Sequence, residues 1–216
     1  KDENGIIRLG RFGWKATSAT LHQQTVDAYN EDMGITTPAG PNTNKTKDGM
    51  PADISWEELD GVTYYSQTLA APATARKADS HVVRAGFKVF NELKCASCHI
   101  AQQHTGFNPN AVAGVINNQT IWPYTDLLVH DMGAELDDGV AEHGLSETYE
   151  WRTTPLWGLG LTKRVNNYVG FLHDGRARTI DEAILWHGGE AEESKNQYVE
   201  LNRGKKDQLL AWLKQL

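Results

Sequence analysis

Both cysteines of the chain lie in one short stretch, "NELKCASCHIAQQH", residues 91–104. Cys95 and Cys98 are separated by two residues, and His99 follows the second cysteine directly. Two thiols and an imidazole at this spacing are typical of the C-x-x-C-H motif, in which thioethers tether a haem c and the histidine binds its iron. The pattern therefore predicts one covalent haem c.

Other chemistries for the two cysteines have weaker support. A disulfide between residues so close in sequence would remove little chain entropy, so a stabilising bridge is not expected. A zinc half-site would need two more ligands and usually a second cysteine pair, which this sequence does not contain. A dithiol redox motif is the remaining alternative.

A haem iron held by a histidine also needs a residue on its far side, whose identity sets the reduction potential. Met132 in "HDMG" and His187 in "RTIDEAILWHGGEA" are the candidates. Thr179 and Glu182 predict a capping box, and the glycine pair 188–189 predicts the helix end, so His187 is expected in the last turn. A histidine there could also simply balance the helix C-terminus, and local chemistry leaves these alternatives open.

Two helices are expected to frame the motif. The stretch "SHVVRAGFKVFNELK" has Val83, Phe87 and Phe90 at helical spacing, with Gly86 among them. The terminal stretch "GKKDQLLAWLKQL" is amphipathic, with apolar positions at Leu209, Trp212, Leu213 and Leu216. A glycine lets two helices approach closely, so Gly86 and Phe90 are predicted to meet Trp212. This combination resembles a class I cytochrome c fold.

Three segments together carry a resemblance to a family. The haem motif, "EWRTTPLWGLGL" and "FLHDGRARTIDEAILWHGG" resemble the C-terminal haem domain of bacterial di-haem cytochrome c peroxidases, most closely the di-haem oxidoreductase, or thiol-oxidoreductase-like, branch. In those peroxidases a methionine-glycine pair ends the corresponding helix, and the methionine binds the high-potential iron. His187 falls at that methionine, whereas "HDMG" resembles a loop in which relatives often lack methionine. The resemblance therefore implies bis-histidine coordination by His99 and His187, with Met132 as the alternative.

Three further residues are candidates for supporting a haem. His173 in "FLHDG" could donate to a propionate, and Arg152 or Arg176 could pair with one, because a guanidinium matches the carboxylate fork. Each also has a simpler interpretation, as a histidine in a turn or a solvated arginine.

The N-terminal stretch "LGRFGWKATSATLHQQTVDAYNEDMGIT" predicts a helix capped by Ser18 or Thr17 and ended by Gly34. A similar stretch closes the first haem domain of the peroxidases. The resemblance implies that Trp14 lies on the path between two haems and that Asp32 acts as acid-base residue for O–O cleavage. Departures are the missing tryptophan-aspartate-glycine-arginine sequence, Asp in place of Glu, and an alignment gap of one residue.

The expected architecture is mainly α. Residues 1–50 form an extension that resembles the end of a first haem domain and includes a loop-rich linker around residues 37–51. Residues 51–216 form a cytochrome c-like haem domain with long loops. The family has two haem motifs and this chain has one, so an N-terminal haem-bearing domain or chain is expected as partner. Apolar surface is then expected around Phe12 and Trp14.

The composition of the chain argues against some classes of binding partner. The formal charge of −7 gives no basic footprint for nucleic acid, and no apolar run approaches the length of a membrane span. The start "KDENGIIRLG" lacks signal-peptide features, so any signal peptide has been removed or was never there. Covalent haem c attachment takes place outside the bacterial cytoplasmic membrane, so the resemblance implies the periplasm. The acidic stretch 132–150 is expected to be a solvated loop or, alternatively, a calcium site, and its acidic residues are Glu135, Asp137, Asp138, Glu142, Glu147 and Glu150.

Three functions follow from these observations. The first is the electron-transfer haem domain of a di-haem peroxidase-like oxidoreductase, which would relay electrons from a redox protein donor to a second haem. The second is a stand-alone monohaem c-type electron carrier. The third is a zinc-stabilised or purely structural module.

Overall fold

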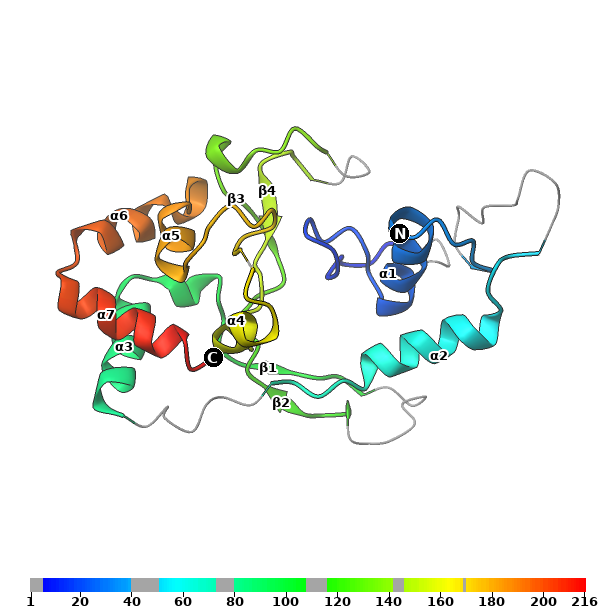
Figure 1. The fold of residues 1–216 in the computed structure, drawn as a ribbon, viewed down its shortest axis with the longest axis horizontal. Coiled ribbons are helices and arrows are strands. Elements are labelled where there is room, and N and C mark those ends of the chain that lie inside the picture. Colours follow the sequence, from blue (N-terminus) through cyan, green and yellow to red (C-terminus); the bar gives the residue numbers. More distant parts are fainter. Residues whose placement is uncertain (1–5, 40–50, 73–79, 108–115, 142–145, 169) are drawn as a thin grey trace. The chain divides into compact units, whose positions relative to one another are not determined.

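The computed structural model describes residues 6–39, 51–72, 80–107, 116–141, 146–168 and 170–216 (Figure 1). The chain divides into an N-terminal unit, Lys1–Ala70, and a haem-motif unit, Ala71–Leu216. Regular structure is mostly helical, as predicted, with two small antiparallel strand pairs among the described residues. The elements are α1 Leu21–Asp27, η1 Ala28–Asp32, α2 Trp56–Gln67, α3 His81–Glu92, η2 Cys95–Ser97, β1 Gln103–His104, β2 Thr120–Ile121, β3 Val129–Asp131, η4 Ala134–Leu136, β4 Glu150–Arg152, η5 Leu159–Leu161, α4 Thr162–Val165, α5 Ile180–Leu185, η6 Gly189–Ala191, α6 Glu192–Glu200 and α7 Arg203–Leu213.

The first helix begins later than the sequence suggested. Thr20 is the N-cap, and its hydroxyl oxygen accepts a hydrogen bond from the backbone N–H of Gln23 at 3.0 Å. The predicted caps, Ser18 and Thr17, were therefore wrong. Ser18 instead donates from its hydroxyl to the carboxylate of Asp27 at 2.7 Å, which ties the approach to the helix to its last residue.

The end of this helical segment agrees with the sequence. A single π-helical turn, η1, extends α1, and Gly34 follows it with φ +68, a backbone conformation that favours glycine. The N–H of Ile35 closes the end by donating to the carbonyl of Tyr29 at 2.8 Å. Val26 from α1 and Leu59 from α2 are buried together, which gives the N-terminal unit its own small core. The predicted boundary between residues 50 and 51 lies inside this unit and stays a prediction.

Helices α3 and α7 pack together at the predicted crossing (Figure 1). A Cβ atom on Gly86 would lie 2.0 Å from the carbonyl oxygen of Gln208 and 2.6 Å from the Cβ of Trp212. The rings of Phe90 and Trp212 have centroids 4.6 Å apart. The predicted contact of Gly86 and Phe90 with Trp212 is confirmed, and only glycine fits at this point of the crossing.

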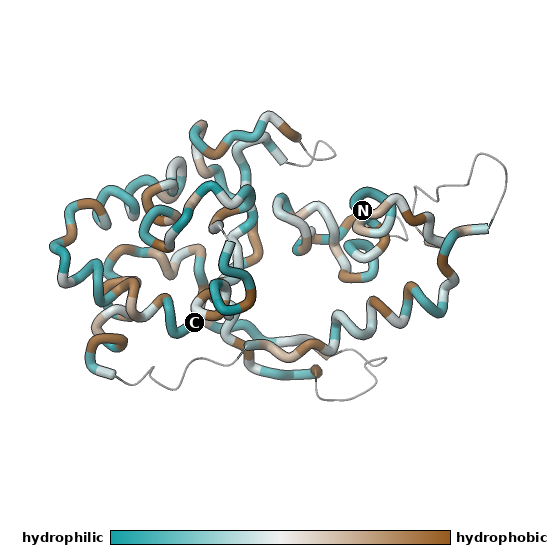
Figure 2. The backbone as a smooth tube through the Cα atoms, viewed as in Figure 1, coloured by the Kyte–Doolittle hydropathy of each residue, from teal (hydrophilic) through white to brown (hydrophobic). Residues whose placement is uncertain are grey.

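The core of the haem-motif unit is built around this crossing, and apolar segments alternate with polar ones along both helices (Figure 2). Its buried residues are Val83, Val89, Phe90, Leu93, Tyr124, Tyr198, Leu209, Trp212, Leu213 and Leu216. Phe87 differs from the expected pattern, since 42% of its surface is exposed. Its ring nevertheless rests against Trp212, with centroids 5.5 Å apart.

The long connection between the motif and α5 contains the two strand pairs. Strands β1 and β2 pair near the motif, and β3 and β4 pair with His130 opposite Trp151. These strands are two or three residues long, so the connection is mostly loop, as expected. Across the described ranges, no helix combines the length and apolar character that crossing a membrane requires.

Candidate haem site

The C-x-x-C-H motif forms a compact turn directly after α3. Lys94 takes a left-handed conformation, with φ +60, and turns the chain into η2. The backbone N–H groups of Cys98 and His99 both donate to the carbonyl of Cys95, the second at 3.0 Å. Local hydrogen bonds thus fix the spacing of the motif.

The two cysteines are half-buried free thiols. Burial raises the pKa of the Cys95 thiol to about 11. The pKa of Cys98 is raised as well, chiefly by burial, with the carboxylates of Asp126 and Glu190 adding to the effect. A reactive dithiol needs a lowered thiol pKa, so this environment disfavours the redox-motif alternative and suits thiols that become thioethers.

His99 is oriented by a backbone carbonyl from a distant segment. Its Nδ1 lies 3.0 Å from the carbonyl oxygen of Tyr124. Because a carbonyl can only accept, Nδ1 carries the proton, and Nε2 is left as the nitrogen available to a metal. Burial lowers the pKa of His99 to about 4, so the imidazole is neutral. Tyr124 itself is held at φ +55, an unfavourable conformation for this residue type, and Asp126 nearby donates its N–H to the carbonyl of Cys98 at 2.9 Å.

His187 follows α5 rather than lying in its last turn. The Thr179 hydroxyl accepts from the N–H of Glu182 at 3.0 Å, as the predicted capping box requires. The Glu182 carboxylate, however, accepts from the N–H of Arg178 at 2.9 Å, so only half of the predicted box forms. The helix ends at Leu185, and His187 lies just beyond its C-cap.

The imidazole of His187 is set up in the same way as that of His99. Its Nδ1 lies 2.8 Å from the carbonyl oxygen of Ala183, which again leaves Nε2 available to a metal. Burial lowers the pKa of His187. The charge of a protonated His187 would lower the pKa of His99, so the two imidazoles are close enough to influence each other electrostatically. Two half-buried, neutral imidazoles with available Nε2 atoms are a donor set that fits haem iron.

Met132, the alternative sixth ligand, lies at the end of β3 and is half-buried. A Cβ on Gly188 would lie 2.8 Å from the Met132 carbonyl oxygen. The segment carrying Met132 therefore contacts the turn that directly follows His187. The two candidate ligands therefore lie in neighbouring segments. The fold alone does not choose between them, and the chemistry of the two side chains has to.

The structure gives His173 and Arg152 well-defined surroundings. His173 stacks on the buried indole of Trp151, with ring centroids 3.4 Å apart and an interplanar angle of 9°. Arg152 lies in β4, and burial lowers its pKa. Its guanidinium makes a long hydrogen bond of 3.5 Å to the carbonyl of Thr153.

Arg176 is more fully engaged by protein groups. Its guanidinium donates to the Asp174 carboxylate and to the Glu135 carbonyl, each at 2.5 Å, and lies 4.9 Å from the ring centre of Trp186. A propionate would have to share this guanidinium with Asp174.

Trp14 and Asp32 belong to the N-terminal unit, and both are exposed. Asp32 is the last residue of η1, and Trp14 exposes 46% of its surface. Phe12 is half-buried. Exposed apolar residues of this unit besides Trp14 include Ile6, Ile7, Leu9 and Met33. That they form one surface around Phe12 and Trp14 stays a prediction.

The sequence interpretation missed an ionic cluster beside the motif. His130 places Nε2 2.9 Å from the carboxylate of Asp126 and Nδ1 2.9 Å from that of Glu190. Burial lowers the pKa of His130, but the two carboxylates outweigh burial and raise it. The Sγ atom of Cys98 is 3.9 Å from Nδ1 of His130. The sequence signal for this cluster is the histidine of "HDMG", which precedes Met132 by two positions.

This cluster resembles a metal site at first sight. In the described part of the chain, Cys98, Asp126 and His130 are the one group of three potential ligands, with donor atoms within 4.8 Å of one another. Both ring nitrogens of His130 face carboxylates, which requires an N–H on each and leaves no lone pair for a metal. None of the described acidic residues of 132–150 joins the group, and Glu142 lies outside the described residues.

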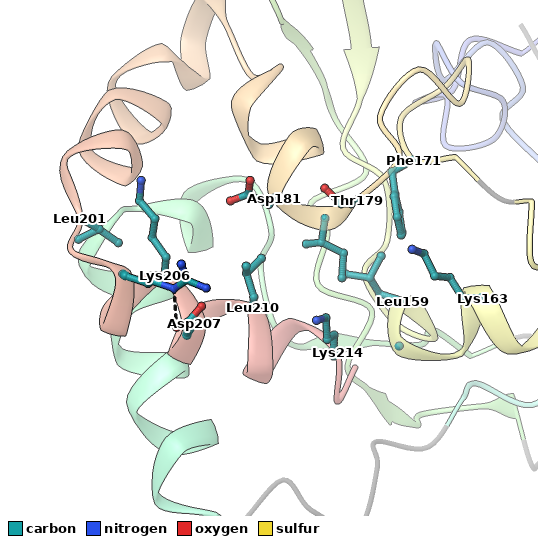
Figure 3. A pocket seen from close by; sticks show the side chains of 13 residues that line it. Leu159, Lys163, Phe171, Thr179, Asp181, Leu201, Lys206, Asp207, Leu210 and Lys214 are labelled. Carbon is teal, nitrogen blue, oxygen red and sulfur yellow. Dashed lines mark ion pairs between the residues drawn. The ribbon is translucent and has the colours of Figure 1, made fainter.

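A separate cleft of about 800 Å³ opens between α7, the start of α5 and η5 (Figure 3). Its lining combines apolar side chains, such as Leu159 and Leu210, with Lys163, Lys214 and Asp181. None of the candidate haem residues lines this cleft, so it is distinct from the motif.

The comparison with known families agrees with the motif. The model of the family described as "Di-haem oxidoreductase, putative peroxidase" matches residues 2–216, which includes both units. A search among curated proteins finds no match. With its haem-attachment motif and a match along nearly its whole length, the chain belongs to the di-haem oxidoreductase family.

Proposed function

We propose that this chain carries one covalent haem c with His99 and His187 as axial ligands, and that it relays electrons to a second haem outside the chain. The observation that carries the proposal is the matched setting of the two imidazoles. Each is half-buried, each gives its Nδ1 proton to a backbone carbonyl, and each has Nε2 available to a metal.

In this proposal Cys95 and Cys98 would form the thioethers, and His99 and His187 would bind the iron. Haem c supplies one-electron transfer when bound, and histidine in place of methionine as sixth ligand lowers the potential. The carbonyls of Tyr124 and Ala183 keep the rings in the ligating tautomer and strengthen them as donors. An iron held by two protein ligands would have no position open to peroxide, so this site would suit an electron relay rather than a peroxide-binding centre.

The second haem is assigned to an N-terminal domain or chain, because the family is di-haem and this sequence has one motif. The exposed apolar residues of the N-terminal unit support such a partner. Trp14 would lie on the electron path between the haems, and Asp32 would serve the second haem as acid-base residue. A redox protein would be the donor, and the periplasm would be the compartment where attachment takes place.

The axial ligands can be tested on the purified haem protein. Pyridine haemochrome analysis should report one covalent haem per chain. The oxidised protein should be low-spin, without the near-infrared band of methionine-ligated haem. His187→Ala should convert it to a high-spin form, whereas the matched Met132→Ala should leave the spectrum unchanged. A near-infrared methionine band that disappears in Met132→Ala would show that methionine is the ligand.

A further inference from the structure

This inference rests on the proposed function, in which His187 is a haem ligand, and it concerns the contacts that hold the chain around His187 in place. The residue lies beyond the end of a six-residue helix, and two glycines follow it. Glycine pays the largest conformational entropy cost when it is fixed, so the turn 188–189 would not hold its position unaided. Hydrogen bonds to Ala183 and Ile184 hold His187 to the end of α5, and Ile180 and Ile184 pack α5 on the core. The glycine turn after His187 needs a contact of its own.

The glycine turn packs directly on the end of β3. A Cβ on Gly189 would lie 2.2 Å from the carbonyl oxygen of Asp131, and one on Gly133 would lie 3.0 Å from the backbone nitrogen of Gly189. The two backbones approach closely, and the Asp131 carboxylate lies beside Gly189. Close packing of two backbones makes the surfaces complementary but contributes little attraction. A stronger interaction is needed to hold the glycine turn against β3.

Glu190, three residues after His187, supplies that bond. One carboxylate oxygen accepts from the backbone N–H of Asp131 at 3.1 Å, and the other accepts from Nδ1 of His130 at 2.9 Å. Hydrogen bonds that involve charged groups are the stronger class. The carboxylate therefore fastens the turn to both the backbone and a side chain of β3.

The same histidine links β3 to the haem motif. Nε2 of His130 contacts the carboxylate of Asp126, whose own backbone N–H donates to the carbonyl of Cys98. The side chains of Asp126 and His130 are only 8% and 16% exposed, so water competes little for their contact. Glu190 is 57% exposed, which makes it the weaker arm. The chain of contacts runs from the motif to the segment of the sixth ligand.

We propose that Asp126, His130 and Glu190 form an ionic clamp that positions His187 relative to the haem motif. These are positioning residues, because none of them binds the iron. With the clamp intact, His187 stays bound and the iron stays closed to external ligands. Without the clamp, the glycine turn is released from β3 and His187 detaches more often.

Carbon monoxide binding to the reduced haem protein tests the clamp, because it needs a vacant axial position. Glu190→Ala and His130→Gln should each raise the CO association rate about tenfold, the expected result of losing a charged hydrogen bond. Glu192→Ala is the matched control, since it removes an acidic residue two positions away that is 61% exposed, and its rate should stay within twofold of wild type. Glu190→Gln keeps the side-chain shape if the alanine variant fails to attach haem, and it should also accelerate CO binding.

The His187→Ala variant shows whether a negative result contradicts the clamp proposal or the assignment of His187 as ligand. This variant should have the highest CO association rate, which is the upper limit for the clamp variants. If it binds CO fast while the clamp variants behave like Glu192→Ala, the clamp is overturned and the ligand assignment stands. If His187→Ala leaves CO binding and the low-spin spectrum unchanged, His187 is not the ligand and both proposals fail.

Discussion

At the scale of single residues, the ionic clamp makes stability depend on pH. The pKa of His130 is raised, since its two carboxylate partners outweigh burial, so its contribution is fully present below its unfolded pKa of about 6.5 and is lost as pH rises through the folded value. The pKa of Glu190 is lowered, first by the His130 hydrogen bond, and that of Asp126 is lowered because its hydrogen bonds outweigh burial. Their contributions are present above about pH 4 and are lost as pH falls through the folded values.

The clamp should therefore stabilise the haem-motif unit most between about pH 4.5 and 6.5. The free energy of unfolding in urea, measured for wild type and for His130→Gln from pH 3 to 9, gives the contribution as a difference. We expect this difference to reach about 1.5–3 kcal/mol inside the window and to shrink on both sides. A difference that does not change with pH would mean that His130 contributes only packing.

The histidines of the site show which contacts could be predicted from the sequence. His99 was predictable from its motif, and the partner of His187 could be inferred, because Ala183 lies one helical turn earlier. The partner of His99 could not, since Tyr124 is 25 positions away in a segment without regular structure. The contact of His130 with Glu190 spans 60 positions, and neither residue belongs to a recognisable motif.

At the scale of elements, the α3–α7 crossing should tolerate no side chain at Gly86. Gly86→Ala places a methyl group within 2.0 Å of the Gln208 carbonyl oxygen. We expect a net loss of about 1–3 kcal/mol in the free energy of unfolding, because overpacking exceeds the helix propensity that alanine gains. Gly61→Ala in α2 is the matched control, since a Cβ there meets nothing within 4 Å, and it should stabilise by up to about 1 kcal/mol. Equal effects of the two substitutions would contradict this account of the crossing.

This crossing was predictable from sequence because its determinants are periodic: one glycine, one aromatic and an apolar stripe at helical spacing. Strands β3 and β4 were not, because three residues are too few for alternation to show. The cap of α1 failed for a different reason. Thr17, Ser18 and Thr20 offer three hydroxyls almost in a row. The Ser18 hydroxyl donates to Asp27, and the Thr20 hydroxyl caps the helix.

At the scale of the whole molecule, the family and the sequence differ in haem number. The family is di-haem, and the matched range 2–216 contains one C-x-x-C-H motif. Exposed apolar side chains in the N-terminal unit include Ile7, at 83% exposure, and Leu9, at 59%. Apolar surface rimmed by polar residues marks an interaction site more often than a free surface. A second haem-bearing domain or chain accounts for both observations.

Native material should therefore contain this chain together with a second covalent haem, on the same polypeptide or on a co-purifying one, and intact mass with haem counting measures this directly. Replacing Ile7 and Leu9 by serine should weaken that association, or the contact between domains, without changing the haem on Cys95 and Cys98. Val165→Ser is the control, because it removes an apolar side chain that is 86% exposed in the other unit, and it should leave association unchanged. Native material that is one chain with one haem, monomeric at high concentration, would instead identify a stand-alone electron carrier.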